Sequence, residues 1–467
     1  MAALCSCDEF VLTSNGKHVA VVQFRTPEEI HVLDVPVVQP KTGTKAPKEP
    51  ETEKTRNSSG KAPQLVNDNG ENSSDDESAE SPCSQNSILA CAISPDGHLA
   101  AVCDDMKYLH LYRVDDAGCR LESSRRVSRR CTRVTFTKDS RDVIVADKSG
   151  DVYKFPVQGP QNTITGIEDS SIEDDETCAW GTLLLGHLSM LLDVLLVDND
   201  SLVLTSDRDE KIRISRYPDA YNIEAYCLGH TQFVVTLAYD EELKVILSGS
   251  GDSTVRLWGL DGKEYHKTSV LAHIPEDAGD VDQKPSGEEG SQQQINPPTK
   301  RASGQHAIQQ ISFCSKCRLL FVSIYRSRHI LVYRLSKDQT SDQPSLQFVT
   351  FLSLQENVAC LSVSQCVLWI VRQTEDTLKL SAYRIEEDGG DVKLSEVEAD
   401  CKENKIIQTL SRKPELFKAP SPSMDLFPFL WKTNFQDDFK NQCHVKRPPH
   451  PGKKEEGAKK TKVDVPS

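Results

Sequence analysis

Short runs of alternating apolar and polar residues, separated by tight turns, repeat along most of the chain. The two clearest copies begin with Gly-His pairs whose histidines, His187 and His230, lie 43 residues apart. In the second copy the pair is followed by FVVTLAY, VILSGSGD and STVRLW, which ends at Trp258. A period of two residues predicts half-buried β-strands. Four such strands in about 40–45 residues predict one blade of a β-propeller.

The same pattern recurs often enough to build a closed ring. Residues 8–35 hold only three strands, and further copies cover 88–114, 126–157, 271–335 (interrupted) and 346–385. A closed propeller commonly completes such a partial blade with a strand from the other end of the chain, and we expect that strand within 391–435. The predicted fold is all-β, a seven-bladed β-propeller over residues 1–435.

Three segments depart from the strand pattern. Residues 36–87 and 275–304 are polar insertions, and residues 436–467 form a lysine-rich tail. Such segments bury too little apolar surface to offset the entropy of ordering, so they are predicted to be disordered.

Composition narrows the class of protein. The chain has 467 residues, a formal net charge of −15 and 15 cysteines without regular spacing. Many of these cysteines sit inside apolar runs, which favours buried free thiols in a reducing compartment over a disulfide framework. No apolar run approaches the length of a membrane span, and the first ten residues lack the character of a secretory signal. We therefore expect a soluble intracellular protein, whose binding of nucleic acid would need local basic patches.

Four residues of the second copy match the hydrogen-bonded set of a WD repeat: His230, Asp252, Trp258 and Ser248 or Ser250. Buried polar groups of this kind are stable when they pair with one another. Aligning the two copies places His187 at His230 and Asp209 at Asp252. We expect all of these residues to be structural.

The first copy differs in its turn, which carries five consecutive charges over 207–211. Lys211 and Arg213 flank Ile212, so both side chains point to the same side of a strand. One interpretation is a solvated hairpin tip, in which ion pairs contribute about 0–1 kcal/mol each. The other is a docking point for a partner, and the partner-binding candidates are Arg208, Asp209, Glu210, Lys211 and Arg213.

Other clusters are weaker signals. Candidates for RNA binding are Arg125, Arg126, Arg129 and Arg130, close to Arg133, and the tail lysines Lys453, Lys454, Lys459 and Lys460. Solvated surface arginines are the alternative. Cys314 and Cys317 have the spacing of zinc ligands but lack a second pair nearby in the sequence, which favours free thiols and no metal. Phosphate-binding loops, nucleophile elbows and zinc-protease motifs do not occur, so nothing supports an enzyme.

The stretch LGHLSMLLDV, followed by LTSDRDEKIRISRYP and IEAYCLGHTQFV, resembles the WD-repeat non-catalytic subunit of eukaryotic tRNA (guanine-N7-)-methyltransferase. The resemblance implies a nuclear, non-catalytic scaffold that binds and stabilises the catalytic subunit as a heterodimer. It also implies that the chain helps position tRNA for N7-methylguanosine formation in the variable loop. S-adenosylmethionine would be bound by the catalytic partner, leaving this chain without a cofactor. By position, Lys211 and Arg213 would touch that partner.

Two other functions compete with this one. Propellers often serve as substrate receptors of ubiquitin ligases, but such receptors usually carry Trp-Asp-x-Arg at a strand end. The four tryptophans here are followed by Gly, Gly, Ile and Lys. A peptide-reading module that uses the narrow end of the channel is the third hypothesis.

Overall fold

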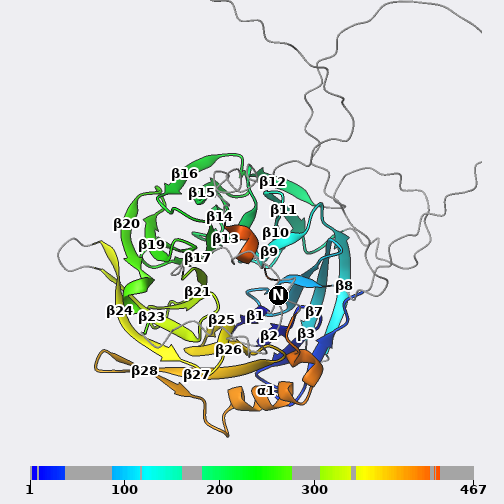
Figure 1. The fold of residues 1–467 in the computed structure, drawn as a ribbon. Helices are drawn as coiled ribbons and strands as arrows, with labels where there is room; N and C mark the ends of the chain where they lie inside the picture. The colour runs from blue at the N-terminus through cyan, green and yellow to red at the C-terminus, as the bar shows by residue number, and fades with distance from the viewer. Residues whose placement is uncertain are drawn as a thin grey trace, which may run out of the picture. The chain divides into compact units, whose positions relative to one another are not determined.

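The structure, a computed structural model, describes residues 3–7, 10–36, 87–115, 118–159, 181–275, 306–337, 343–420, 425 and 427–431. Its strands form seven antiparallel sheets of four strands each, set as blades around a common axis (Figure 1). The predicted seven-bladed β-propeller is confirmed. All seven sheets belong to one compact unit, Met1–Asp425, and a second unit comprises Leu426–Ser467. The segments predicted to be disordered lie almost wholly outside the described residues.

Each blade is a meander whose strands pair in chain order. The strands of the first four blades are β1 (Ala3–Ser6), β2 (Phe10–Ser14), β3 (Val19–Gln23) and β4 (His31–Leu33); β5 (Ile88–Ile93), β6 (Leu99–Asp104), β7 (Tyr108–Asp115) and β8 (Gly118–Arg126); β9 (Cys131–Phe136), β10 (Asp142–Asp147), β11 (Asp151–Pro156) and β12 (Thr182–Gly186); β13 (Leu191–Val197), β14 (Leu202–Asp207), β15 (Lys211–Arg216) and β16 (Ile223–Leu228).

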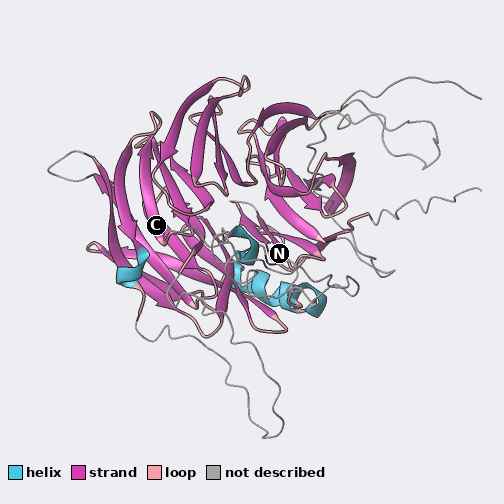
Figure 2. Cartoon of the chain, turned by 45° about the horizontal axis from the view of Figure 1, so that its top comes forward, coloured by secondary structure: helices cyan, strands magenta, loops and turns pink. Residues whose placement is uncertain are grey.

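The remaining three blades follow the same plan. Their strands are β17 (Val234–Asp240), β18 (Val245–Ser250), β19 (Thr254–Gly259) and β20 (Glu264–Ser269); β21 (Ile308–Cys314), β22 (Leu319–Ile324), β23 (His329–Lys337) and β24 (Pro344–Ser353); β25 (Asn357–Ser364), β26 (Val367–Gln373), β27 (Leu378–Asp388) and β28 (Asp391–Glu396). The helical segments are short: η1 (Val270–His273), α1 (Lys402–Ser411), η2 (Pro414–Phe417) and, in the second unit, α2 (Phe427–Leu430). Figure 2 shows how far strands dominate. None of the described helices has the length and apolar character needed to cross a membrane.

Burial differs between the inner and outer strands of a blade. The second strands β6, β18 and β22 are buried along their whole length, because neighbouring blades cover both faces of the sheet. They accordingly read as continuous small or apolar runs, such as VILSGS. The outer strand β20 is largely exposed and polar, whereas β16, with the sequence IEAYCL, is largely exposed but mostly apolar.

The ring closes differently from the prediction. The short segment β1 pairs with β2 and completes the first blade, so no strand from the C-terminal region is needed. Closure is made by packing between blades, with the Ser6 hydroxyl 2.8 Å from that of Ser362 on β25. Residues 391–435 instead supply β28, which pairs with β27, and helix α1. Ile406 and Leu410 of α1 are buried in the core shared by the first and last blades.

Candidate partner-binding site on the fourth blade

The charged turn of the fourth blade joins β14 to β15 and is held by Asp207. One carboxylate oxygen of Asp207 accepts a hydrogen bond from the backbone N–H of Lys211 at 3.0 Å. The other lies 3.1 Å from Nδ1 of His187, whose Nε2 lies 2.8 Å from the Thr205 hydroxyl. Asp207 is buried, so the start of the turn is fixed by the fold.

The aspartate that pairs with His187 is therefore Asp207, and the expectation that Asp209 plays this part was wrong. The pairing register shows why. Asp207 faces Leu191 across β13 and β14, in the same way that Ser250 faces Val234 in the next blade. The fourth blade carries its aspartate at the end of the second strand, whereas the fifth blade carries Asp252 two residues later.

In the fifth blade the predicted hydrogen-bonded set is present. Trp258 Nε1 donates to the Ser248 hydroxyl at 2.8 Å, and that hydroxyl lies 2.8 Å from His230 Nε2. His230 Nδ1 lies 3.0 Å from the Asp252 carboxylate. Burial lowers the pKa of His230 despite the nearby carboxylate. A neutral imidazole with its proton on Nδ1 satisfies every donor and acceptor in this chain.

Apart from Asp207, the charges of the 207–211 run are not needed to form the turn. Glu210 adopts a left-handed conformation with φ of 71°, and Ser253 adopts the same conformation at the matching place in the fifth blade, with φ of 63°. The fifth blade makes its turn with small residues and a single charge, Asp252. In the fourth blade Lys211 is exposed, and Arg208, Asp209 and Glu210 are half-exposed. The charges thus form a surface feature added to an ordinary turn.

Arg213 is not available at that surface. Its side chain is only 7% exposed, and burial lowers the pKa of its guanidinium. The guanidinium donates to the Ser215 hydroxyl at 2.8 Å, to the Gly186 carbonyl at 3.2 Å and to the Ala220 carbonyl at 2.8 Å. The inference that both cations are free to meet a partner was therefore wrong for Arg213, which joins three segments of the blade from within. Lys211 keeps an exposed side chain.

Apolar side chains exposed beside the turn were not predicted from the sequence. Leu228, on β16, faces Lys211 across the β15–β16 pair and is 65% exposed. Tyr226 faces Arg213 on the same outer strand and is also exposed. Leu188, in the loop that precedes β13, is fully exposed. We call Leu188, Lys211, Tyr226 and Leu228 the docking patch. The leucines at these positions could have signalled it, because adjacent exposed apolar side chains often mark an interaction site.

The run of arginines between the second and third blades separates into three groups. Arg125 is only 6% exposed and donates to the carbonyls of Pro156 and Val157, so it is structural and cannot serve as an RNA ligand in this conformation. Arg133, on β9, forms an ion pair with Asp193 of β13 at 3.0 Å. Arg126, Arg129 and Arg130 are exposed.

These three exposed arginines lie on the same face of the propeller as the charged turn. Backbone hydrogen bonds link the successive loops of this face: Val127 N to Lys107 O, Lys148 N to Arg130 O, His187 N to Gly150 O and Arg208 N to Met190 O. Lys148, in the β10–β11 turn, is exposed as well. We call Arg126, Arg129, Arg130 and Lys148 the basic arc. It leads around the face from the second blade towards the docking patch.

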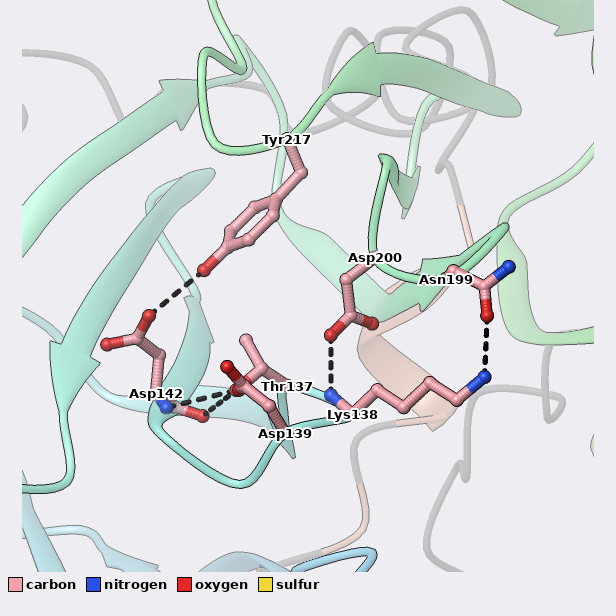
Figure 3. A pocket seen from close by; sticks show the side chains of 7 residues that line it. All are labelled: Thr137, Lys138, Asp139, Asp142, Asn199, Asp200 and Tyr217. Atoms are coloured by element: carbon pink, nitrogen blue, oxygen red, sulfur yellow. Dashed lines mark hydrogen bonds between the residues drawn. The ribbon is translucent and has the colours of Figure 1, made fainter.

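The opposite face is acidic between the third and fourth blades. A cavity of about 360 Å³ is lined by Thr137, Lys138, Asp139, Asp142, Asn199, Asp200 and Tyr217 (Figure 3). Its polar groups bond with one another: Lys138 Nζ donates to Asn199 at 2.6 Å, and the Tyr217 hydroxyl donates to Asp142 at 3.4 Å. The turn at 198–201 precedes β14 and the charged turn follows it, so the cavity and the docking patch lie at opposite ends of that strand. Carboxylates at this end disfavour a polyanion.

The tail lysines Lys453, Lys454, Lys459 and Lys460 lie outside the described residues. Their assignment to RNA binding stays a prediction from the sequence.

Seven four-stranded blades with a buried histidine, aspartate, serine and tryptophan set define a WD-repeat β-propeller. The chain belongs to a particular branch of this class, the tRNA methyltransferase TRM82 WD40 domain family, which matches residues 11–180 and 168–377.

Relatives with descriptive names agree with this membership. The chain is 37% identical over 272 residues to the "tRNA (guanine-N(7)-)-methyltransferase non-catalytic subunit wdr4" of Danio rerio, covering 58% of this chain and 56% of that protein. It is 41% identical over 198 residues to the subunit WDR4 of Homo sapiens, covering 42% and 43%. The subunit wuho of Culex quinquefasciatus is 29% identical over 364 residues, covering 78% and 75%. The match thus spans about half the length of the two vertebrate relatives.

A solved structure shares the architecture at low sequence identity. A chain of "Crystal Structure of Mitotic Checkpoint Complex" aligns with a TM-score of 0.50 and 10% identity, covering 79% of this chain and 85% of that chain. At this identity the likeness concerns the fold alone.

Proposed function

We propose that this chain is the non-catalytic scaffold subunit of a heterodimeric tRNA (guanine-N7)-methyltransferase. It binds and stabilises the catalytic subunit at the docking patch and helps position tRNA for N7-methylguanosine formation in the variable loop. S-adenosylmethionine is bound by the catalytic partner. The complex works in the nucleus, which microscopy of a fluorescently tagged chain would test.

The observation that carries the proposal is the surface of the fourth blade. Exposed charges occupy a turn that the fifth blade builds without them, and exposed leucines flank the same turn. Apolar contacts surrounded by complementary charges are the usual composition of a protein interface. Charges at the rim also steer association and fix the register of the two partners. The relatives are named as subunits, which implies a partner for such a surface.

Electrostatics support the placement of tRNA on the same side. The chain as a whole carries a formal charge of −15, so an RNA would be repelled from most of its surface. The basic arc is exposed on the face that holds the charged turn, while the far side is acidic at the cavity. A tRNA held by a catalytic subunit on the fourth blade would therefore run along the arc, where lysine and arginine contact phosphates.

Reconstitution tests the proposal. The full chain, the catalytic subunit from the same organism, S-adenosylmethionine and unmodified tRNA are combined, and N7-methylguanosine is measured by mass spectrometry of the digested tRNA. We expect a one-to-one complex of the two proteins and methylation that needs the catalytic subunit and is strongly increased by this chain. Failure of the two proteins to form a complex, or methylation by this chain alone, would overturn the proposal.

A further inference from the structure

Three cysteines from two neighbouring blades meet at one place. Cys314 ends β21, Cys317 lies in the turn to β22, and Cys366 lies in the turn between β25 and β26 of the next blade. Their sulphur atoms all lie within 4.8 Å of one another, and the sulphurs of Cys317 and Cys366 are 3.2 Å apart. This is a thiol cluster that the sequence does not reveal, because the third member is 49 residues away.

The spacing of the sulphurs fits a metal ion well. Tetrahedral coordination with a Zn–S distance of about 2.3 Å places the ligand sulphurs about 3.8 Å apart. The observed sulphur separations run from 3.2 Å to at most 4.8 Å, which brackets this value. Side-chain movements of about 1 Å or less would therefore bring the three sulphurs to the separation that zinc requires. A disulfide would need about 2.05 Å and would leave one thiol of the three unused. The docking patch lies on a different blade and has no part in this cluster.

We propose that Cys314, Cys317 and Cys366 bind one thiophilic metal ion, such as Zn²⁺, through three thiolates. Thiolate donors select zinc and copper(I) over hard cations such as Mg²⁺. Cys314 is buried, whereas Cys317 and Cys366 are half-buried, so an ion can enter from the surface. A water molecule or an external group takes the fourth position on zinc.

The two turns hold their cysteines in place before any ion binds. The carbonyl of Cys366 accepts a hydrogen bond from the Ile385 backbone at 2.9 Å, and the carbonyl of Arg318, next to Cys317, accepts one from Leu335 at 2.9 Å. Such preorganisation reduces the ordering that binding requires. A bound ion would add a further link between the sixth and seventh blades, which already share the hydrogen bond from Gln310 Nε2 to the Leu361 carbonyl at 2.8 Å and an apolar core.

Binding exchanges protons for the metal. A cysteine thiol must lose its proton to bind a metal as a thiolate. One Zn²⁺ binds three thiolates and releases three protons, which leaves a site with a net charge of −1. Zinc affinity should therefore rise with pH, and zinc should raise the thermal midpoint of the chain.

Metal content and affinity of the full chain test the proposal. Cysteines outside the described residues can bind zinc too, so the comparison is between variants. The chain is purified with reductant, stripped with a chelator and titrated with Zn²⁺ against a chromophoric competitor. We expect Cys317→Ser and Cys366→Ser each to lose one zinc ion per chain, or to bind it at least about 100-fold more weakly. The matched control, Cys119→Ser, changes a half-buried thiol elsewhere and should keep the ion.

Two further readouts keep the result clear. If a variant does not fold, zinc-edge X-ray absorption of the wild-type chain should still show sulphur ligands at about 2.3 Å, and their absence would overturn the proposal. Equal zinc content in the folded variants and the wild type would overturn it as well. A Cys317–Cys366 disulfide in the metal-free protein, with no zinc bound after reduction, would assign the cluster to redox chemistry instead.

Discussion

Replacing Arg213 by methionine removes the guanidinium that joins three segments of the fourth blade. The side chain is buried and donates to the Ser215 hydroxyl and to the carbonyls of Gly186 and Ala220. Methionine has similar length and fills much of the same space, so the change removes hydrogen bonds more than packing. Among the described residues no carboxylate pairs with Arg213, so no acid is left unpaired.

The expected loss of stability follows from those three bonds. A buried acceptor left without a donor costs about 1–3 kcal/mol, and removing a buried charge recovers part of that cost. We expect a net loss of about 2–4 kcal/mol. One kcal/mol lowers the thermal midpoint of a unit of 150–250 residues by about 2–4 °C, and that of a larger unit by less. The midpoint of the full chain should therefore fall by about 3–6 °C.

Differential scanning calorimetry of the full chain without its partner checks this value. The control is Arg216→Met on the same strand, where an exposed arginine pairs with Glu224 at the surface and contributes at most about 1 kcal/mol. Equal midpoints for Arg213→Met and the wild type would refute the structural assignment. Equal midpoints together with lost partner binding would show that Arg213 meets the partner directly.

Three further predictions concern closure, pH and RNA. Deleting residues 1–7 removes β1, so the first blade loses its inner strand. The truncated chain should unfold at a lower denaturant concentration than the wild type. An unchanged denaturation midpoint would argue against closure by β1. Burial lowers the pKa of His230 below its ordinary value of 6.5, so the unfolded chain takes up the proton first and stability should fall as the pH drops below about 6.5. His230→Gln should make denaturation midpoints less dependent on pH between about 7.5 and 5.5, and an identical dependence would contradict this. Changing Arg126, Arg129 and Arg130 to glutamate should weaken tRNA binding by the complex and flatten its dependence on salt, while the two proteins still co-purify; unchanged tRNA binding in filter assays would remove the basic arc from the account.

Local pattern was sufficient to predict the propeller. Neighbouring residues alone show the alternation in strands such as VVTLAYD and the run of small and apolar residues in VILSGS. The spacing of the two Gly-His pairs gives the repeat length. The closure of the ring was not predictable in this way. β1 has only four residues, ALCS, and becomes a strand through its contacts with β2 and with the blades on either side.

The site was predictable only in part, since burial depends on the whole fold. The sequence identified the charged turn, but alternation alone could not distinguish an exposed Lys211 from a buried Arg213 on the same strand. Assuming a fixed repeat length also gave His187 the wrong partner. The aspartate that pairs with the histidine lies two residues earlier in the fourth blade than in the fifth. The thiol cluster depends on Cys366 in the next blade, and only the packing of two blades brings it beside Cys314 and Cys317.

In the proposed complex the fourth blade docks the catalytic subunit through Lys211 and its cross-strand neighbour Leu228. The most direct measurement is the Kd between the purified subunits for the wild type, for Lys211→Glu with Leu228→Asp, and for a control, Lys393→Glu, on an exposed lysine of β28 in the seventh blade. We predict that the double variant binds at least about 10-fold more weakly, a loss of about 1.4 kcal/mol or more, with an unchanged thermal midpoint. The control should bind like the wild type. An unchanged Kd for the folded double variant would contradict the account.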